Sequence, residues 1–168
     1  MLRQIFSVTG IAHRVIPRTK SPSGGIEIAN TFQRARASMS VSQILQSDIP
    51  AKIGLSIDPG KDFDPYGIFD PALHRFKPVD AGYYQVNVRP SWAVALGNGS
   101  RLAVYKNGVE HVAYACYAVN APIFVLSDLI FLNGTTDYLE MWAFHMFGTD
   151  LAASAGLIGT HMSIVGPF

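Results

Sequence analysis

Apolar and polar residues alternate with a period of two over several short stretches of the chain, and no stretch shows the period of a helix. In the run Tyr83–Val88, Tyr84, Val86 and Val88 fall on one side, and the residues between them are mostly polar. Successive side chains of a strand point to opposite faces, so this pattern predicts an antiparallel strand with one face in a core. The run Ile53–Ile57 alternates in the same way.

Turn signals separate these stretches. The pairs Asn98-Gly99, Asn107-Gly108 and Asn133-Gly134 each lie between strand-like runs, and each predicts a two-residue hairpin turn, because both positions of such a turn accept positive φ. Further strands are expected at 101–106, 109–119, 122–132, 137–145 and 160–165. Many short strands without a helical run predict an all-β fold, an antiparallel β-sandwich.

The first forty residues have no sustained period and are interrupted by Pro17, Pro22, Gly24 and Gly25. They contain neither a heptad nor a Gly-X-Y repeat, so a coiled-coil or collagen stalk is not expected. We interpret residues 1–40 as an extended arm and residues 41–168 as a head domain.

Charge is distributed unevenly between these two parts. The arm has six basic residues against Glu27, a net charge of +5, whereas residues 41–168 have a net charge of −4. Such asymmetry is typical of an arm that docks on an acidic surface, although a solvated leader would have it too. The candidate docking residues are Arg3, Arg14, Arg18, Lys20, Arg34 and Arg36.

The composition indicates that the chain has more apolar surface than a folded monomer of this size can easily bury. Hydrophobic residues make up 49% of the 168 positions and charged residues 15%, against about 25% charged in typical soluble domains. The mean hydropathy is +0.21. A buried subunit interface is the simplest explanation. Cys116 is the only cysteine, so no intrachain disulfide is expected.

The order of several segments resembles that of a known family. These are Phe69–Val88, with its phe-asp-pro and pro-x-x-gly-x-tyr pieces, then Leu102–Gly108, Asp128–Gly134, Tyr138–Ala143 and Met162–Gly166. Together they resemble the jelly-roll heads of complement and tumour-necrosis-factor-like proteins. The resemblance implies a jelly roll that assembles as a compact homotrimer.

Residues 138–144 are apolar on both faces of the expected strand, which suggests the core on one side and a partner subunit on the other. We therefore expect aromatic side chains at the trimer interface. The candidates are Tyr83, Tyr138, Trp142 and Phe144.

No catalytic arrangement stands out. A Gly-x-Ser-x-Gly motif is absent, and the histidines lack metal-ligand spacing, so they are interpreted as core or interface residues. The carboxylates of Asp58, Asp62 and Asp64 could hold calcium, but Asp-Pro-Gly is itself a turn signal, and the turn is the better interpretation. The Asn-Gly-Ser and Asn-Gly-Thr sequons are better explained as hairpins. Most of the aromatic residues alternate within strands and are interpreted as core or trimer interface, whereas Trp92 lies in a less regular segment and is expected to be exposed.

The function we expect is that of a bacteriophage virion structural protein, a homotrimeric capsid decoration or cement protein whose arm contacts the major capsid protein. The alternative is the receptor-binding tip of a tail or head fibre, which would hold host surface glycans with loops near Asn98 or Asn107. A cellular lectin-like protein and an enzyme are less favoured. No cofactor, metal, nucleic acid or membrane insertion is expected. The protein would lie on the capsid surface after assembly in the host cytoplasm.

Overall fold

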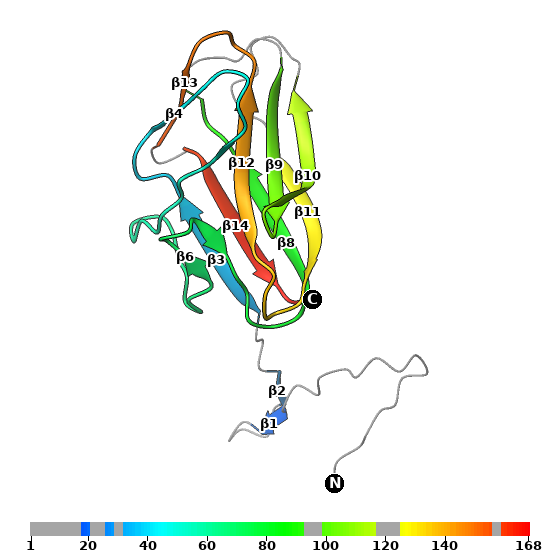
Figure 1. Ribbon diagram of the computed structural model, residues 1–168. Coiled ribbons are helices and arrows are strands. Elements are labelled where there is room, and N and C mark those ends of the chain that lie inside the picture. Colours follow the sequence, from blue (N-terminus) through cyan, green and yellow to red (C-terminus); the bar gives the residue numbers. More distant parts are fainter. Residues whose placement is uncertain (1–17, 21–25, 29–31, 93–98, 117–124, 156–158) are drawn as a thin grey trace. The chain divides into compact units, whose positions relative to one another are not determined.

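The computed structural model describes residues 18–20, 26–28, 32–92, 99–116, 125–155 and 159–168. The chain forms two units, Met1–Thr31 and Phe32–Phe168. In the first unit, β1 (Arg18–Lys20) pairs antiparallel with β2 (Ile26–Ile28). The second unit is the head, and its strands are coloured along the sequence in Figure 1.

All regular elements of the described head are strands, and no helix there is long and apolar enough to cross a membrane. The strands are β3 (Gln33–Ser38), β4 (Gln43–Leu45), β5 (Ala51–Lys52), β6 (Phe69–Asp70), β7 (Arg75–Phe76), β8 (Gly82–Arg89), β9 (Ser100–Lys106), β10 (Val109–Cys116), β11 (Leu126–Leu132), β12 (Leu139–His145), β13 (Leu151–Ala153) and β14 (His161–Gly166).

Two antiparallel sheets form the sandwich (Figure 1). The four-stranded sheet has the order β11-β8-β14-β3. The larger sheet has the order β10-β9-β12-β7-β6, and β5 pairs with β12 beside this path. A small β13-β4 pair lies at one end. Neighbouring strands come from distant parts of the sequence, which is the topology of a jelly roll.

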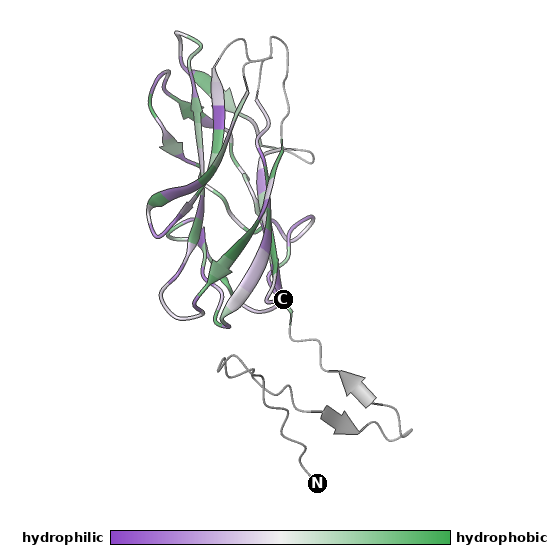
Figure 2. Cartoon of the chain, turned by 90° about the vertical axis from the view of Figure 1, so that its right-hand side faces the viewer, coloured by the Kyte–Doolittle hydropathy of each residue, from purple (hydrophilic) through white to green (hydrophobic). Residues whose placement is uncertain are grey.

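The core lies between the two sheets. On β8, Tyr84, Val86 and Val88 are fully buried, while the residues between them are partly or well exposed. Hydrophobic and hydrophilic segments accordingly lie side by side on the same strands in Figure 2. The larger sheet contributes Leu102, Val104, Leu139 and Met141 to the same core cluster. The all-β sandwich and the alternation on β8 are confirmed.

The three Asn-Gly pairs differ in outcome. Asn107 and Gly108 join β9 to β10 with φ values of 57° and 77°, so the predicted two-residue hairpin is confirmed. The prediction for Asn133-Gly134 is wrong, because β11 pairs with β8 while the next strand, β12, pairs with β9. This segment therefore crosses between the sheets. Asn98 lies outside the described residues.

The beginning of the head also differs from the expectation. β3 lies within residues 1–40, but it pairs along its whole length with β14, and the compact unit starts at Phe32. Its buried apolar residues, Ala35 and Ala37, are small and alternate with arginines, so the sequence shows no apolar run that would predict a strand here. In the run 53–57, Ile53 and Leu55 are buried as expected, but only Ser56 forms a bridge, to Ser38.

Two glycines with positive φ provide a matched test of the sheet crossing. Gly134 has a φ of 72°, and an added Cβ would lie 2.5 Å from the backbone nitrogen of Ala81. Gly148 has a φ of 82°, and nothing lies within 4 Å of its added Cβ. We expect Gly148→Ala to cost about 1–2 kcal/mol for the backbone conformation alone. Gly134→Ala should cost clearly more, because the backbone must also move.

Urea unfolding of both variants at one protein concentration measures this difference. Equal losses of stability would show that the contact between Gly134 and the 80–81 backbone is not tight.

Candidate functional site

The outward face of the four-stranded sheet is apolar at one end. Tyr83 on β8 and Phe131 on β11 are register partners, and their ring centroids lie 5.4 Å apart. Both are about half exposed, as is Leu129, which is the next outward residue on β11. We call Tyr83, Leu129 and Phe131 the apolar patch.

The middle of the same face is polar. The Gln85 side-chain amide donates to the Ser127 hydroxyl at 2.7 Å, and that hydroxyl donates to Asn87 Oδ1 at 2.8 Å. These three residues belong to β8 and β11 and lie directly next to the apolar patch in the strand register. The Ser127 hydroxyl is thus paired in both directions, so it would not be left unpaired when this zone is covered.

The other end of the face is basic. His161 on β14 pairs in register with Arg89, and Arg36 lies on the neighbouring β3. Burial lowers the pKa of His161, and the positive charges of Arg36 and Arg89 lower it further. The Arg36 guanidinium lies 3.4 Å from the buried carboxylate of Asp62. The face thus changes from apolar to basic along β8.

Two edge strands meet at one side of the sandwich. β10 ends the larger sheet and β11 ends the four-stranded sheet, and the two lie side by side (Figure 1). Val109, Tyr114 and Val125 on or beside these strands are half to two-thirds exposed. An exposed edge strand with apolar side chains offers both backbone groups and apolar surface to a partner.

The predicted interface residues lie on opposite sides of the sandwich. Tyr83 belongs to the four-stranded sheet, whereas Trp142 and Phe144 point outward from β12 of the larger sheet, with Tyr138 just before that strand. The Arg75 guanidinium lies over the Tyr138 ring, with its Cζ 4.6 Å from the ring centroid. One flat surface therefore does not contain all four aromatic residues.

The predicted docking residues are also divided. Arg18 and Lys20 lie in β1 of the first unit, and Arg34 and Arg36 lie in β3 of the head. Arg3 and Arg14 lie outside the described residues.

The aspartates of the 58–64 loop bind backbone groups, as the turn interpretation predicted. Asp58 accepts from the Gly60 amide, and Asp64 accepts from the amides of Ile68 and Phe69 at 2.9 Å. The Gly60 amide and Lys61 lower the pKa of Asp58. Asp62 accepts a short hydrogen bond from Ser38. Within the described residues, no group of three potential metal-ligating side chains was found.

The expectation that Trp92 is open to solvent is wrong. Its side chain is 5% exposed and packs edge-on against His145, with the ring centroids 5.7 Å apart. His145 is buried, and its Nε2 lies 3.0 Å from the Leu45 carbonyl, so it is a core histidine as expected. The irregular sequence around Trp92 reflects a strand end, where a bridge to Ala153 holds the chain in place.

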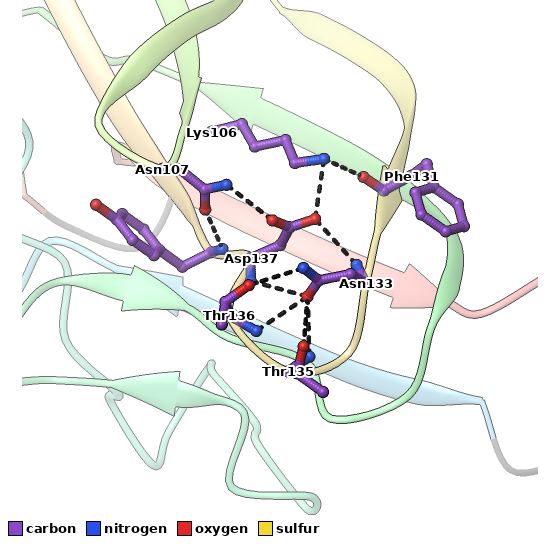
Figure 3. A network of polar contacts seen from close by, with 8 residues as sticks. Lys106, Asn107, Phe131, Asn133, Thr135, Thr136 and Asp137 are labelled. Atoms are coloured by element: carbon purple, nitrogen blue, oxygen red, sulfur yellow. Dashed lines mark hydrogen bonds and ion pairs between the residues drawn. The ribbon is translucent and has the colours of Figure 1, made fainter.

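The 133–138 segment is fixed by a polar network (Figure 3). The Asn133 side-chain oxygen accepts from the amides of Thr135, Thr136 and Asp137. The Asp137 carboxylate accepts from Asn107 Nδ2 at 2.8 Å and lies 3.0 Å from the Lys106 ammonium. The network ties the crossing between the sheets to the β9–β10 hairpin. The Asn133-Gly134-Thr135 motif, interpreted from the sequence as a hairpin turn, is thus a loop cap.

Asp137 should make the stability of the head depend on pH. Burial alone raises the pKa of its carboxyl, but hydrogen bonds from Asn107, Lys106 and the Asn133 amide outweigh burial and lower it. The carboxylate therefore stabilises the fold above the ordinary pKa of about 3.9, and this contribution is lost as the pH falls through the lower pKa of the folded state.

We expect Asp137→Asn to lower the unfolding midpoint at neutral pH, and the gap to the unchanged protein to close in acid. Thermal unfolding of both proteins between about pH 3 and pH 7 measures the gap. A gap that does not depend on pH would contradict the assigned role of the charge.

Comparisons with known proteins address the fold. No family model matches the chain, and no curated protein matches its sequence. Among solved structures, Eiger TNF from S. frugiperda matches with a TM-score of 0.57 and 11% identity, over 82% of this chain and 93% of that one. The globular domain of zebrafish complement 1qA matches with a TM-score of 0.53 and 10% identity, over 81% and 97%.

A phage protein is also similar. The PRD1 vertex protein P5 matches with a TM-score of 0.52 and 14% identity, over 94% of this chain and 85% of that one. The resemblance expected from the sequence is confirmed: the chain has the jelly-roll fold of TNF and complement C1q globular domains.

Proposed function

We propose that the head assembles as a homotrimer, with the face of the four-stranded sheet of each copy set against the β10–β11 edge of the next. A threefold ring needs two different surfaces on each copy, because its contacts are heterologous. The head offers two such surfaces: the apolar patch of Tyr83, Leu129 and Phe131, and the edge with Val109, Tyr114 and Val125. Covering both surfaces would also bury exposed apolar side chains, which the composition predicts to be in excess on a monomer.

This arrangement gives the predicted interface residues different roles. Tyr83 is part of the proposed interface, at the apolar end of the face. Trp142 and Phe144 point outward from the larger sheet, on the opposite side of the sandwich, and would remain on the outside of the trimer. The interface is thus best tested at Leu129 and Phe131.

We further propose that this trimer is a structural protein of a bacteriophage virion, a capsid decoration protein and not an enzyme. The observation that carries this proposal is the similarity to the PRD1 vertex protein P5, which extends over more of this chain than the similarity to Eiger or complement 1qA. A trimer suits the threefold and quasi-threefold positions of an icosahedral shell. The partner is the major capsid protein, and the location is the capsid surface.

The first unit supplies the proposed contact with the shell. Residues 1–31 contain Arg3, Arg14, Arg18 and Lys20 against Glu27, so the unit is basic. An arm that orders on binding spreads its contacts over a wide surface, at an entropic cost. Arg34 and Arg36 belong to β3, so their contribution to docking would come from the head.

The trimer interface can be tested by one charge substitution. Leu129→Lys puts an ammonium group in the centre of the proposed contact, where it would be buried without a partner, so the trimer should dissociate into folded monomers. Ile44→Lys is the control, because Ile44 is also an exposed aliphatic residue of a strand but lies on β4, away from both surfaces. Light scattering after size exclusion gives the mass of each variant. A Leu129→Lys protein that stays trimeric would exclude this face.

The docking role of the arm can be tested by deletion. Residues 1–31 should be removed, and not 1–40, because the longer deletion takes away β3 and with it an edge of the four-stranded sheet. We expect the shortened protein to remain trimeric and to lose binding to shells that lack the protein. A full-length variant with Arg3, Arg14, Arg18 and Lys20 changed to Gln separates charge from length. Sedimentation with purified shells measures both, and undiminished binding of the deletion variant would contradict the proposal.

A further inference from the structure

The outward face of the larger sheet contains a hollow of about 120 Å³. Trp142 and Phe144 form two of its sides. They stand two residues apart on β12, which corresponds to about 7 Å along a strand. Ala103, the register partner of Trp142, lies beside it on β9, lines the hollow and is 4% exposed. A small residue beside two aromatic ones leaves space that a flat ring can enter.

Trp142 is held rigidly in this position. Its ring stacks on Tyr105 with a centroid distance of 4.6 Å and an angle of 16°. Its Nε1 donates to Glu140 Oε2 at 3.2 Å, and Glu140 Oε1 lies 2.9 Å from the Lys52 ammonium. Tyr105 does not line the hollow, so it supports the indole from outside the space that a ligand would occupy. The aromatic wall is therefore already ordered before binding, which lowers the entropic cost of binding.

The rim of the hollow is polar and electrically balanced. Arg101 forms an ion pair with Glu110 across β9 and β10, and both residues line the hollow. Beside it, Lys52 is paired with Glu140. Two cations thus face two carboxylates, and the surroundings of the hollow have no net charge. A nucleic acid or another polyanion would need an excess of positive charge.

The hollow continues along the sheet. A second hollow of about 360 Å³ shares Arg101 and Phe144 with the first and extends over Ala113, Ala115 and Met146. The two hollows adjoin at Arg101 and Phe144 and lie on β12, β9 and β10, and we call them together the groove. A groove of this kind has room for one ring in the narrow part and for further units beside it.

We propose that this groove binds a neutral saccharide, with one pyranose ring between Trp142 and Phe144. The apolar C–H face of the sugar packs on the aromatic wall, and its hydroxyl groups bind the paired guanidinium and carboxylate of Arg101 and Glu110. An amphipathic, uncharged ring uses both features of the site, whereas an apolar side chain would contact the aromatic wall but make no hydrogen bond to the paired groups of the rim. The site is on the sheet face, and not in the loops near Asn98 or Asn107.

This inference does not depend on the proposed role in a virion. One shallow site of this size is expected to bind a monosaccharide with a Kd on the order of 1 mM. In the proposed trimer, three copies of the groove would face outward, and a surface with repeated glycans would be held more tightly through multivalency.

The test begins with the full-length protein on an array of neutral and acidic bacterial glycans, followed by calorimetric titration of the best neutral oligosaccharide. Trp142→Ala removes a wall, and Ala103→Phe fills the hollow while leaving Trp142 in place. We expect each to weaken binding about tenfold or more. Tyr66→Ala is the matched control, because it removes an exposed aromatic ring in a loop that does not line the groove, and it should bind like the unchanged protein.

Several outcomes would overturn the inference. These are the absence of saccharide binding at millimolar concentration, binding that is restricted to acidic glycans, and binding that neither groove variant weakens. Circular dichroism and native mass confirm that each variant is folded. If Trp142→Ala fails to fold, Ala103→Phe still tests the groove.

Discussion

The register of β8 is the constraint on which the rest of the head depends. β8 is the one strand of the described part that pairs with both β11 and β14, so its alternation decides what faces the core and what faces outward. A shift by one residue would put Tyr83 and Gln85 in the core and Tyr84 and Val86 in solvent. In this register the buried Tyr84 hydroxyl has partners, since it lies 2.8 Å from the Asp80 carbonyl and 3.2 Å from Gln33 Oε1. Burial, with the nearby Asp80 charge, raises the pKa of this phenol and keeps it a hydrogen-bond donor.

With this register the sandwich has two outward faces of different chemistry. The four-stranded face has the apolar patch at one end, which suits association with a second copy of the chain, and Arg89 and the Arg36–Asp62 pair at the other end. The face of the larger sheet has paired charges around aromatic residues, which suits a small neutral ligand. The proposed trimer covers the first face and leaves the second one open. Assembly and ligand binding therefore need not compete.

Much of the fold could be predicted from the sequence, because local patterns determine it. The alternation of Tyr83–Val88 is a property of one strand, and the Asn107-Gly108 turn is complete within four residues, so both were predicted. Strand pairing is a long-range property. Asn133-Gly134 has the same local signal, but the flanking strands belong to different sheets, and nothing in its neighbourhood in the sequence says so.

The candidate site was harder to predict from the sequence for the same reason. Trp142 and Tyr83 look alike as outward aromatic residues of strands, and only the sheet order puts them on opposite sides. The hollow depends on Ala103 lying opposite Trp142, which is a register between strands forty residues apart. β3 was assigned to the arm because its buried apolar residues are only alanines, which give little hydrophobic signal between arginines.

The number of copies per particle tests the central claim most directly. Quantitative mass spectrometry of purified virions gives the ratio of this chain to the major capsid protein. A shell decoration protein is predicted to be present in hundreds of copies at a fixed ratio to the capsid protein. A handful of trimers per particle, or none, would contradict that role, and a handful would put the protein at a vertex or on the tail.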